Sequence, residues 1–263
     1  MKVKLTIAYE GTEYSGWQCQ TNRVTVQQRV EEALACILQE TVRLHSSSRT
    51  DTGVHALGLV AHAELPERAS ALSESKLELA LNAHLPDDIR VVGVRRVPAG
   101  FHARFDARGK QYRYQVWNDR SGNPMLRRHA WVVYKPLDME SMRSAAKLLV
   151  GKHDFVSFAG TRNYEMETTV RTVVRCDVQR KGSLITFIIE ADGFLYKMCR
   201  SIVGTLIQIG LGKFDAGEIL TMLEGRDRRV AGMTAPAHGL TLWKVYYESK
   251  RLPRKPVRDR RPV

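Results

Sequence analysis

The sequence predicts an α+β fold with antiparallel or mixed sheets, built as two related halves. Some short stretches alternate apolar and polar residues, as half-buried strands do, and others repeat apolar residues every three to four positions, as amphipathic helices do. The first hundred residues read as strand, helix, strand, helix, strand, and the second half resembles that order loosely. With 263 residues, the chain is long enough for one large domain or two modest ones.

The elements of the first half follow from local pattern. Val3, Leu5 and Ile7 alternate with polar neighbours and predict a strand. Thr25 is a suitable N-cap for the helix that follows. The remaining predictions are a helix over 26–40, a strand over 56–65, a helix over 73–85 and a strand over 89–97.

The second half contains a predicted hairpin whose turn is Lys181-Gly182, between strands over 170–180 and 184–191. The other predictions are strands over 111–117, 130–134 and 240–247, and helices over 138–150, 194–211 and 215–224. Chain-breaking residues between Pro98 and Lys110 mark the best boundary. We therefore expect an N-terminal domain over 1–107, a basic C-terminal domain over 108–249 and a tail over 250–263.

Charge is concentrated in the second half. Residues 1–107 carry 12 Lys/Arg and 13 Asp/Glu, whereas residues 108–263 carry 29 and 15. The tail holds seven basic residues, one acid and three prolines, so we expect it to be disordered. Without the tail, residues 108–249 still carry a net charge of +8 (22 against 14), which indicates a polyanionic partner.

Several classes of protein do not fit the sequence. It has no apolar signal segment and no stretch of roughly twenty apolar residues that could cross a membrane. The four cysteines, at positions 19, 36, 176 and 199, lack zinc-site spacing and are expected to be reduced thiols of a cytoplasmic protein. Gly210-Leu211-Gly212-Lys213-Phe214 lacks the spacing of a phosphate-binding loop. The sequence therefore predicts no metal site and no phosphate-binding loop.

The most informative segment is Arg49-Thr50-Asp51-Thr52-Gly53-Val54-His55-Ala56. An aspartate beside a fixed cation stays ionised, and a glycine two positions later allows a sharp turn. These features suit a nucleophile or a base, although Asp-Thr-Gly is also a common turn sequence without function. An aspartic protease would need a second such carboxylate, and only one Asp-Thr-Gly occurs.

The longer segment resembles the catalytic loop of the tRNA pseudouridine synthase A family, which usually reads Gly-Arg-Thr-Asp-Ala-Gly-Val-His-Ala. Four further blocks resemble that family in order along the chain: Tyr14-Ser15-Gly16-Trp17-Gln18, Phe101–Tyr114, Phe194–Gly204 and Thr234–Leu240. The resemblance implies the pseudouridine synthase fold with a central RNA-binding cleft, a homodimer, and isomerisation of uridines 38, 39 and 40 in the anticodon stem-loop of tRNA. It also implies that no cofactor is needed, since the uracil is detached from N1 and rejoined through C5 without redox change.

The resemblance also assigns residues. Asp51 becomes the catalytic carboxylate, which attacks C1′, adds to the base or takes a 2′ proton. Arg200 pairs with it, although by position alone Arg200 could be a surface arginine whose stem lies along the helix. Tyr112 becomes the platform for the flipped base, although the strand pattern alone favours a core residue on the same face as Tyr114. Arg49 contacts RNA or the neighbours of the flipped nucleotide.

Basic residues around the second block suit a phosphate track, because they alternate with aromatic ones. They are Arg104, Arg108, Lys110 and Arg113. The alternative is a strand edge protected by charge. His55 and His102 are expected to be structural.

The match has departures beside the aspartate. Ser48 replaces the usual Gly, Thr52 the usual Ala and Leu59 a usual Gln. Two rival functions therefore stay open: a non-catalytic RNA-binding protein on the same scaffold, and a pseudouridine synthase with another RNA target.

Overall fold

The computed structural model describes residues 1–161, 168–248 and 252. The chain divides into two compact units. The first comprises Met1–Arg108 and the described residues from Leu242 onward, and the second comprises Gly109–Thr241. Apart from Leu252, the basic tail expected to be disordered lies outside the described residues.

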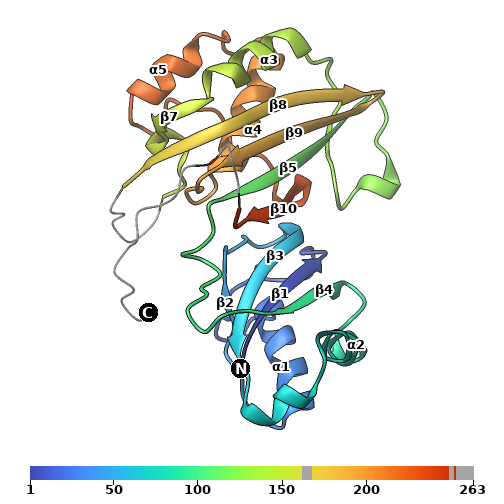
Figure 1. The fold of residues 1–263 in the computed structure, drawn as a ribbon. Coiled ribbons are helices and arrows are strands. Elements are labelled where there is room, and N and C mark those ends of the chain that lie inside the picture. The colour runs from blue at the N-terminus through green and yellow to red at the C-terminus, as the bar shows by residue number, and fades with distance from the viewer. Residues whose placement is uncertain (162–167, 249–251, 253–263) are drawn as a thin grey trace. The chain divides into compact units, whose positions relative to one another are not determined.

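The first unit is an antiparallel sheet with two helices (Figure 1). Its strands follow the order β4 (Ile89–Arg96), β1 (Lys2–Tyr9), β3 (His55–Glu64), and β3 also pairs with the short β2 (His45–Ser46). β10 (Leu240–Tyr246) lies on the other side of β3. The helices are α1 (Val26–Leu38) and α2 (Glu74–His84), and α2 packs on β4.

Alternation in the sequence explains the core of this unit. Val3, Leu5 and Ile7 are almost fully buried, while the residues between them are half-buried. Leu5 lies opposite Ala61 of β3 and Val94 of β4, so a paired strand flanks it on each side. Thr25 caps α1 as predicted, because its side chain accepts a hydrogen bond from the N–H of Gln28.

The second unit is a sheet with helices packed on it (Figure 1). Its strand order is β5 (Gly109–Asn118), β9 (Leu184–Ala191), β8 (Val170–Lys181), β7 (Gly151–Asp154), all antiparallel, and β6 (Trp131–Val133) runs parallel to β5. α3 (Met139–Leu148) packs against β8 and α4 (Met198–Gly210), and α5 (Glu218–Glu224) packs against α3 and β7. Across both units, short 3₁₀ helices occur at Glu67–Ala71, Pro124–Leu126, Val156–Phe158 and Ala237–Gly239.

The α+β class and the predicted hairpin are confirmed, and Gly182 adopts φ +60° in its turn. The helix predicted from residue 194 was wrong at its start, because α4 begins at Met198. The Tyr196 carbonyl instead accepts the N–H of Gly160, at 2.8 Å, and Lys197 adopts a left-handed φ of +59°. The hydrogen bond between Gly160 and Tyr196 thus takes the place of the first turn of the predicted helix. The short strands β2 and β7 were not predicted, because two and four residues carry too little periodicity.

The described residues include neither a candidate membrane span nor a candidate metal-binding cluster. None of its helices has the length and apolar character needed to span a bilayer. It also contains no group of three or more His, Cys, Asp or Glu side chains arranged to hold a metal ion. All four cysteines are free thiols, and burial raises the pKa of Cys176 to about 12.

Candidate active-site residues in the two units

Asp51 begins a tight turn between β2 and β3. Its carbonyl accepts the N–H of Val54 at 3.1 Å, and Gly53 adopts φ +75° at the third position of this turn. A positive φ there is what a glycine supplies without strain. The local turn reading is therefore correct, and it leaves Asp51 half-buried and Arg49 exposed.

The segment that follows β1 forms hydrogen bonds with the Asp51 turn and the residues beside it. His55 is buried and its Nδ1 accepts the N–H of Gly11 at 3.0 Å, so this histidine has a structural contact. The backbone N–H of Trp17 donates to the Thr50 carbonyl at 3.2 Å. In the sequence, the block around Trp17 was notable only for its resemblance to the family. The structure shows that this block holds the residues beside Asp51.

The three departures from the family pattern have different surroundings. Thr52 is exposed, so its added methyl and hydroxyl groups point away from the core. Leu59 is fully buried in β3, where an apolar side chain is favoured. Ser48 is buried, and its hydroxyl has no hydrogen-bond partner within the described part of the protein.

In the second unit, Arg200 and Tyr114 bind neighbouring carbonyl groups. The Arg200 Nε donates to the Ala235 carbonyl at 2.8 Å, and the Tyr114 hydroxyl donates to the Pro236 carbonyl at 2.8 Å. These bonds join α4 and β5 through one short segment. Next to it, burial lowers the pKa of His238, and the charge of Arg200 lowers it further against the opposing hydrogen bond with the backbone of Ala130.

Tyr112 lies on β5 on the same face as Tyr114, and both rings are buried. The Tyr112 ring packs edge-on against Phe194, with 4.9 Å between ring centroids. Lys110 shares this face by alternation, whereas Arg113 lies on the opposite one and donates from Nε to Gln111 at 3.0 Å. The structure therefore brings Lys110 and Tyr112 to one side of the strand and separates Arg113 from them.

A clamp that the sequence did not reveal holds the segment over 228–235 on α4. Thr205 Oγ1 accepts the N–H of Gly232 at 3.0 Å, and Gln208 Oε1 accepts the N–H of Met233 at 2.7 Å. Arg228 donates to the Ala231 carbonyl and to Thr234 Oγ1. Thr and Gln spaced three residues apart within an apolar helix were the only signal of this contact.

The predicted site residues fall into both units. Asp51, Arg49, Arg104 and Arg108 belong to the first unit. Lys110, Tyr112, Arg113 and Arg200 belong to the second. The Asp51–Arg200 pair and the continuous phosphate track therefore stay predictions.

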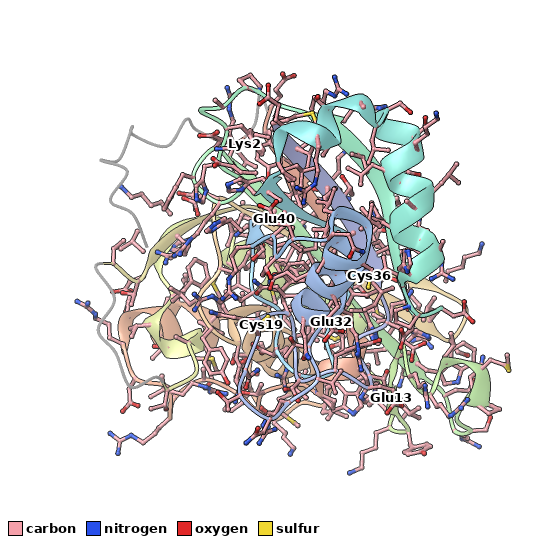
Figure 2. All side chains as sticks on the ribbon, turned by 90° about the horizontal axis from the view of Figure 1, so that it is seen from below. Lys2, Glu13, Cys19, Glu32, Cys36 and Glu40 are labelled. Atoms are coloured by element: carbon pink, nitrogen blue, oxygen red, sulfur yellow. The ribbon has the colours of Figure 1, made fainter. Side chains whose placement is uncertain are left out.

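The first unit also has an open hollow of about 680 Å³ beside α1. Glu32 and Cys36 of α1 and Glu13 of the preceding segment line it. These three residues are labelled in Figure 2. Arg29 of its lining is paired with Glu32 at 2.9 Å, so the hollow has no excess of positive charge that would attract a polyanion. The residues described as lining it include none of the predicted site residues.

Comparison with known proteins agrees with the order of the sequence blocks. The family described as tRNA pseudouridine synthase matches residues 5–106 and 145–248. The chain is 46% identical over 252 residues to the tRNA pseudouridine synthase A of Geobacillus kaustophilus, covering 95% of each chain. It is 44% identical to that of Acetivibrio thermocellus, covering 93% of this chain and 99% of the relative. A solved Cbf5-Nop10-Gar1 complex contains a chain with a TM-score of 0.39 and 11% identity, covering 91% of this chain and 57% of that one.

These matches first define a class. The chain has an α+β fold, an aspartate in a hydrogen-bonded turn, and a family match in both of its units. It is therefore an RNA-modifying isomerase. The chain belongs to the tRNA pseudouridine synthase family.

Proposed function

We propose that this chain isomerises uridine to pseudouridine in tRNA at positions 38, 39 and 40 of the anticodon stem-loop, with Asp51 as nucleophile or base. The supporting observation is the half-buried Asp51 in an ordered turn within a chain of this family. Binding RNA alone would gain nothing from a partly buried anion, because a carboxylate repels phosphate.

The reaction places one carboxylate near C1′ of the target uridine. As the N1–C1′ bond breaks, the uracil leaves as an anion and the carboxylate captures or stabilises the sugar. The base then turns and C5 bonds to C1′, and where the carboxylate had bonded to C1′ that bond breaks and the carboxylate leaves with its electron pair. The proton lost from C5 is balanced by the proton gained at N1. Atoms and electrons balance without an external reactant, so the chemistry requires no cofactor.

A uridine in a stem must leave its stack before the carboxylate can reach it. We assign the stacking platform to Tyr112, since aromatic stacking contributes about 1–3 kcal/mol per base. Arg200 is assigned to hold the Asp51 carboxylate ionised and in one rotamer. The bond from Arg200 Nε to Ala235 supports this assignment, because it orients the guanidinium.

The RNA backbone is assigned to a basic set on both units, consistent with the net charge of +8 over residues 108–249. This set comprises Arg104, Arg108, Lys110 and Arg113, while Arg49 is assigned to contact RNA or the neighbours of the flipped nucleotide. We further propose a cytoplasmic homodimer whose RNA cleft spans both subunits. This part rests on family resemblance, and light scattering of the purified protein tests the stoichiometry.

The deciding experiment incubates the protein with unmodified tRNA transcripts, without added metal or cofactor, and maps pseudouridine by position. We expect product at 38, 39 or 40, and we expect Asp51→Asn to abolish it while retaining tRNA affinity. Pseudouridine at other positions would replace the target assignment. Tight binding without product would favour the non-catalytic alternative.

A further inference from the structure

Tyr9, the last residue of β1, contacts the catalytic turn although it is distant from it in sequence. Its side chain is 5% exposed, and its hydroxyl lies 2.7 Å from Thr50 Oγ1. Thr50 immediately precedes Asp51. The side chain of Tyr9 therefore reaches the residue that sets the backbone direction into the carboxylate.

The Tyr9–Thr50 hydrogen bond persists over the working pH range. Burial raises the pKa of the Tyr9 phenol well above its ordinary value, against the opposing effect of the bond to Thr50. Both hydroxyl groups stay neutral, so either can donate. The Tyr9 hydroxyl therefore stays protonated, because burial raises its pKa.

A second contact holds the backbone of Thr50. The Thr50 carbonyl accepts the backbone N–H of Trp17, and a Cβ on Gly16 would lie only 2.5 Å from that carbonyl oxygen. Gly16 adopts φ +84°, which permits this close approach. The rings of Tyr9 and Trp17 lie 6.2 Å apart, so the two residues that hold Thr50 also pack on each other.

We infer that Tyr9 is a positioning residue for catalysis, which fixes Asp51 by holding the Thr50 hydroxyl. The inference rests on the proposed function, in which Asp51 is the catalytic carboxylate. Thr50 has its side chain held by Tyr9 and its carbonyl held by the backbone of Trp17, so the residue next to Asp51 is anchored at two points. A displacement of about 1 Å at a reacting group can cost on the order of 10²-fold in rate.

Tyr9→Phe tests this role because it removes one oxygen and keeps the ring that packs on Trp17. We expect the single-turnover rate constant on saturating tRNA to fall at least 10-fold, by the same factor from pH 6 to pH 9. We expect the Kd for tRNA to change by less than twofold. Tyr14→Phe is the matched control: Tyr14 is also buried, but its hydroxyl donates to Asp88 at 2.6 Å, and its rate should stay within twofold of the parent.

A double-mutant cycle separates positioning from general destabilisation. Thr50→Val removes the partner hydroxyl, and Thr50→Ser keeps it. If Tyr9 acts through Thr50, the double variant Tyr9→Phe/Thr50→Val loses no more rate than either single variant, and Thr50→Ser retains most of the rate.

Full single-turnover activity of Tyr9→Phe, or losses that multiply in the double variant, would overturn the inference. An active Asp51→Asn would instead overturn the proposed function. An inactive Asp51→Asn beside a fully active Tyr9→Phe removes only the positioning role.

Discussion

Arg200 and Ala235 bind each other in both directions. The Arg200 Nε donates to the Ala235 carbonyl at 2.8 Å, and the Ala235 N–H donates to the Arg200 carbonyl at 3.0 Å. The first bond restricts the guanidinium, while the second fixes the backbone that carries it. Although the Arg200 side chain is long and flexible, these two bonds restrict the orientation of its guanidinium.

Arg200→Lys should therefore lower turnover by about 10-fold or more although the positive charge is kept. Arginine can bind the Ala235 carbonyl through Nε and still offer its two terminal nitrogens to a carboxylate. Lysine has a single ammonium group and cannot do both. Rates on saturating tRNA and the Kd for tRNA check this. Near-parental turnover would show that charge alone matters at this position.

Thr52→Ala should keep or raise turnover, because Thr52 is exposed and only Gly53 is needed for the positive φ of the turn. The expected free energy of unfolding lies within about 0.5 kcal/mol of the parent. Rate measurement on the tRNA transcript decides the matter. A large loss of turnover would mean that the Thr52 side chain takes part in the reaction or in RNA binding.

Ser48→Ala should stabilise the first unit by about 1 kcal/mol. The Ser48 hydroxyl is buried and lacks a partner among the described residues, so its removal relieves a desolvation cost. Urea unfolding of parent and variant gives the comparison. A loss of stability would indicate that an ordered water satisfies this hydroxyl.

Gly204→Ala should prevent stable folding of the second unit. A Cβ at this position of α4 would lie 1.9 Å from the Met233 carbonyl oxygen, which the clamp holds in place. Gly217→Ala is the control, since Gly217 has φ −66° and nothing within 4 Å of its Cβ position. We expect the control to gain about 0.4–1 kcal/mol by losing freedom in the unfolded chain. Equal thermal midpoints for the two variants would contradict the close approach.

The stability of the first unit should fall as pH falls from about 6.5 towards 4. Burial, the neighbouring His102 and His45, and Lys2 lower the pKa of His62 from 6.5 to about 4. In this window the unfolded chain binds a proton at His62 that the folded chain does not, so acid favours unfolding. The stabilising contribution is fully present above pH 6.5.

His62→Asn should flatten that pH dependence. The Asn side-chain oxygen can replace Nδ1, which accepts the N–H of Ala103 at 3.2 Å, and it does not titrate. Unfolding free energies at pH 4.5, 5.5, 6.5 and 7.5 measure the slope. An unchanged slope in the variant would assign the effect to other groups.

Local pattern predicted much of this fold for a definable reason. Alternation at Val3, Leu5 and Ile7 and the cap at Thr25 depend on the chain's own geometry, which needs no distant partner. The Lys181-Gly182 hairpin and the turn at Asp51 likewise need only a glycine with positive φ. The candidate site residues could be assigned because the family's sequence blocks occur in the same order along this chain.

Local pattern failed where a distant segment replaced local bonds. The start of α4 moved to Met198, because the Tyr196 carbonyl binds Gly160. Periodicity reports that a residue is buried, but not which segment covers it.

The sequence by itself determined the secondary-structure types, the basic second half and the Asp51 turn, since each depends on residue identity at short spacing. Only the tertiary structure decided that β10 returns to β3 and that the clamp over 228–235 holds α4. It also decided that Tyr9 reaches Thr50. These contacts join residues dozens of positions apart, and their partners are selected by the packing of whole elements, which no short stretch of sequence encodes.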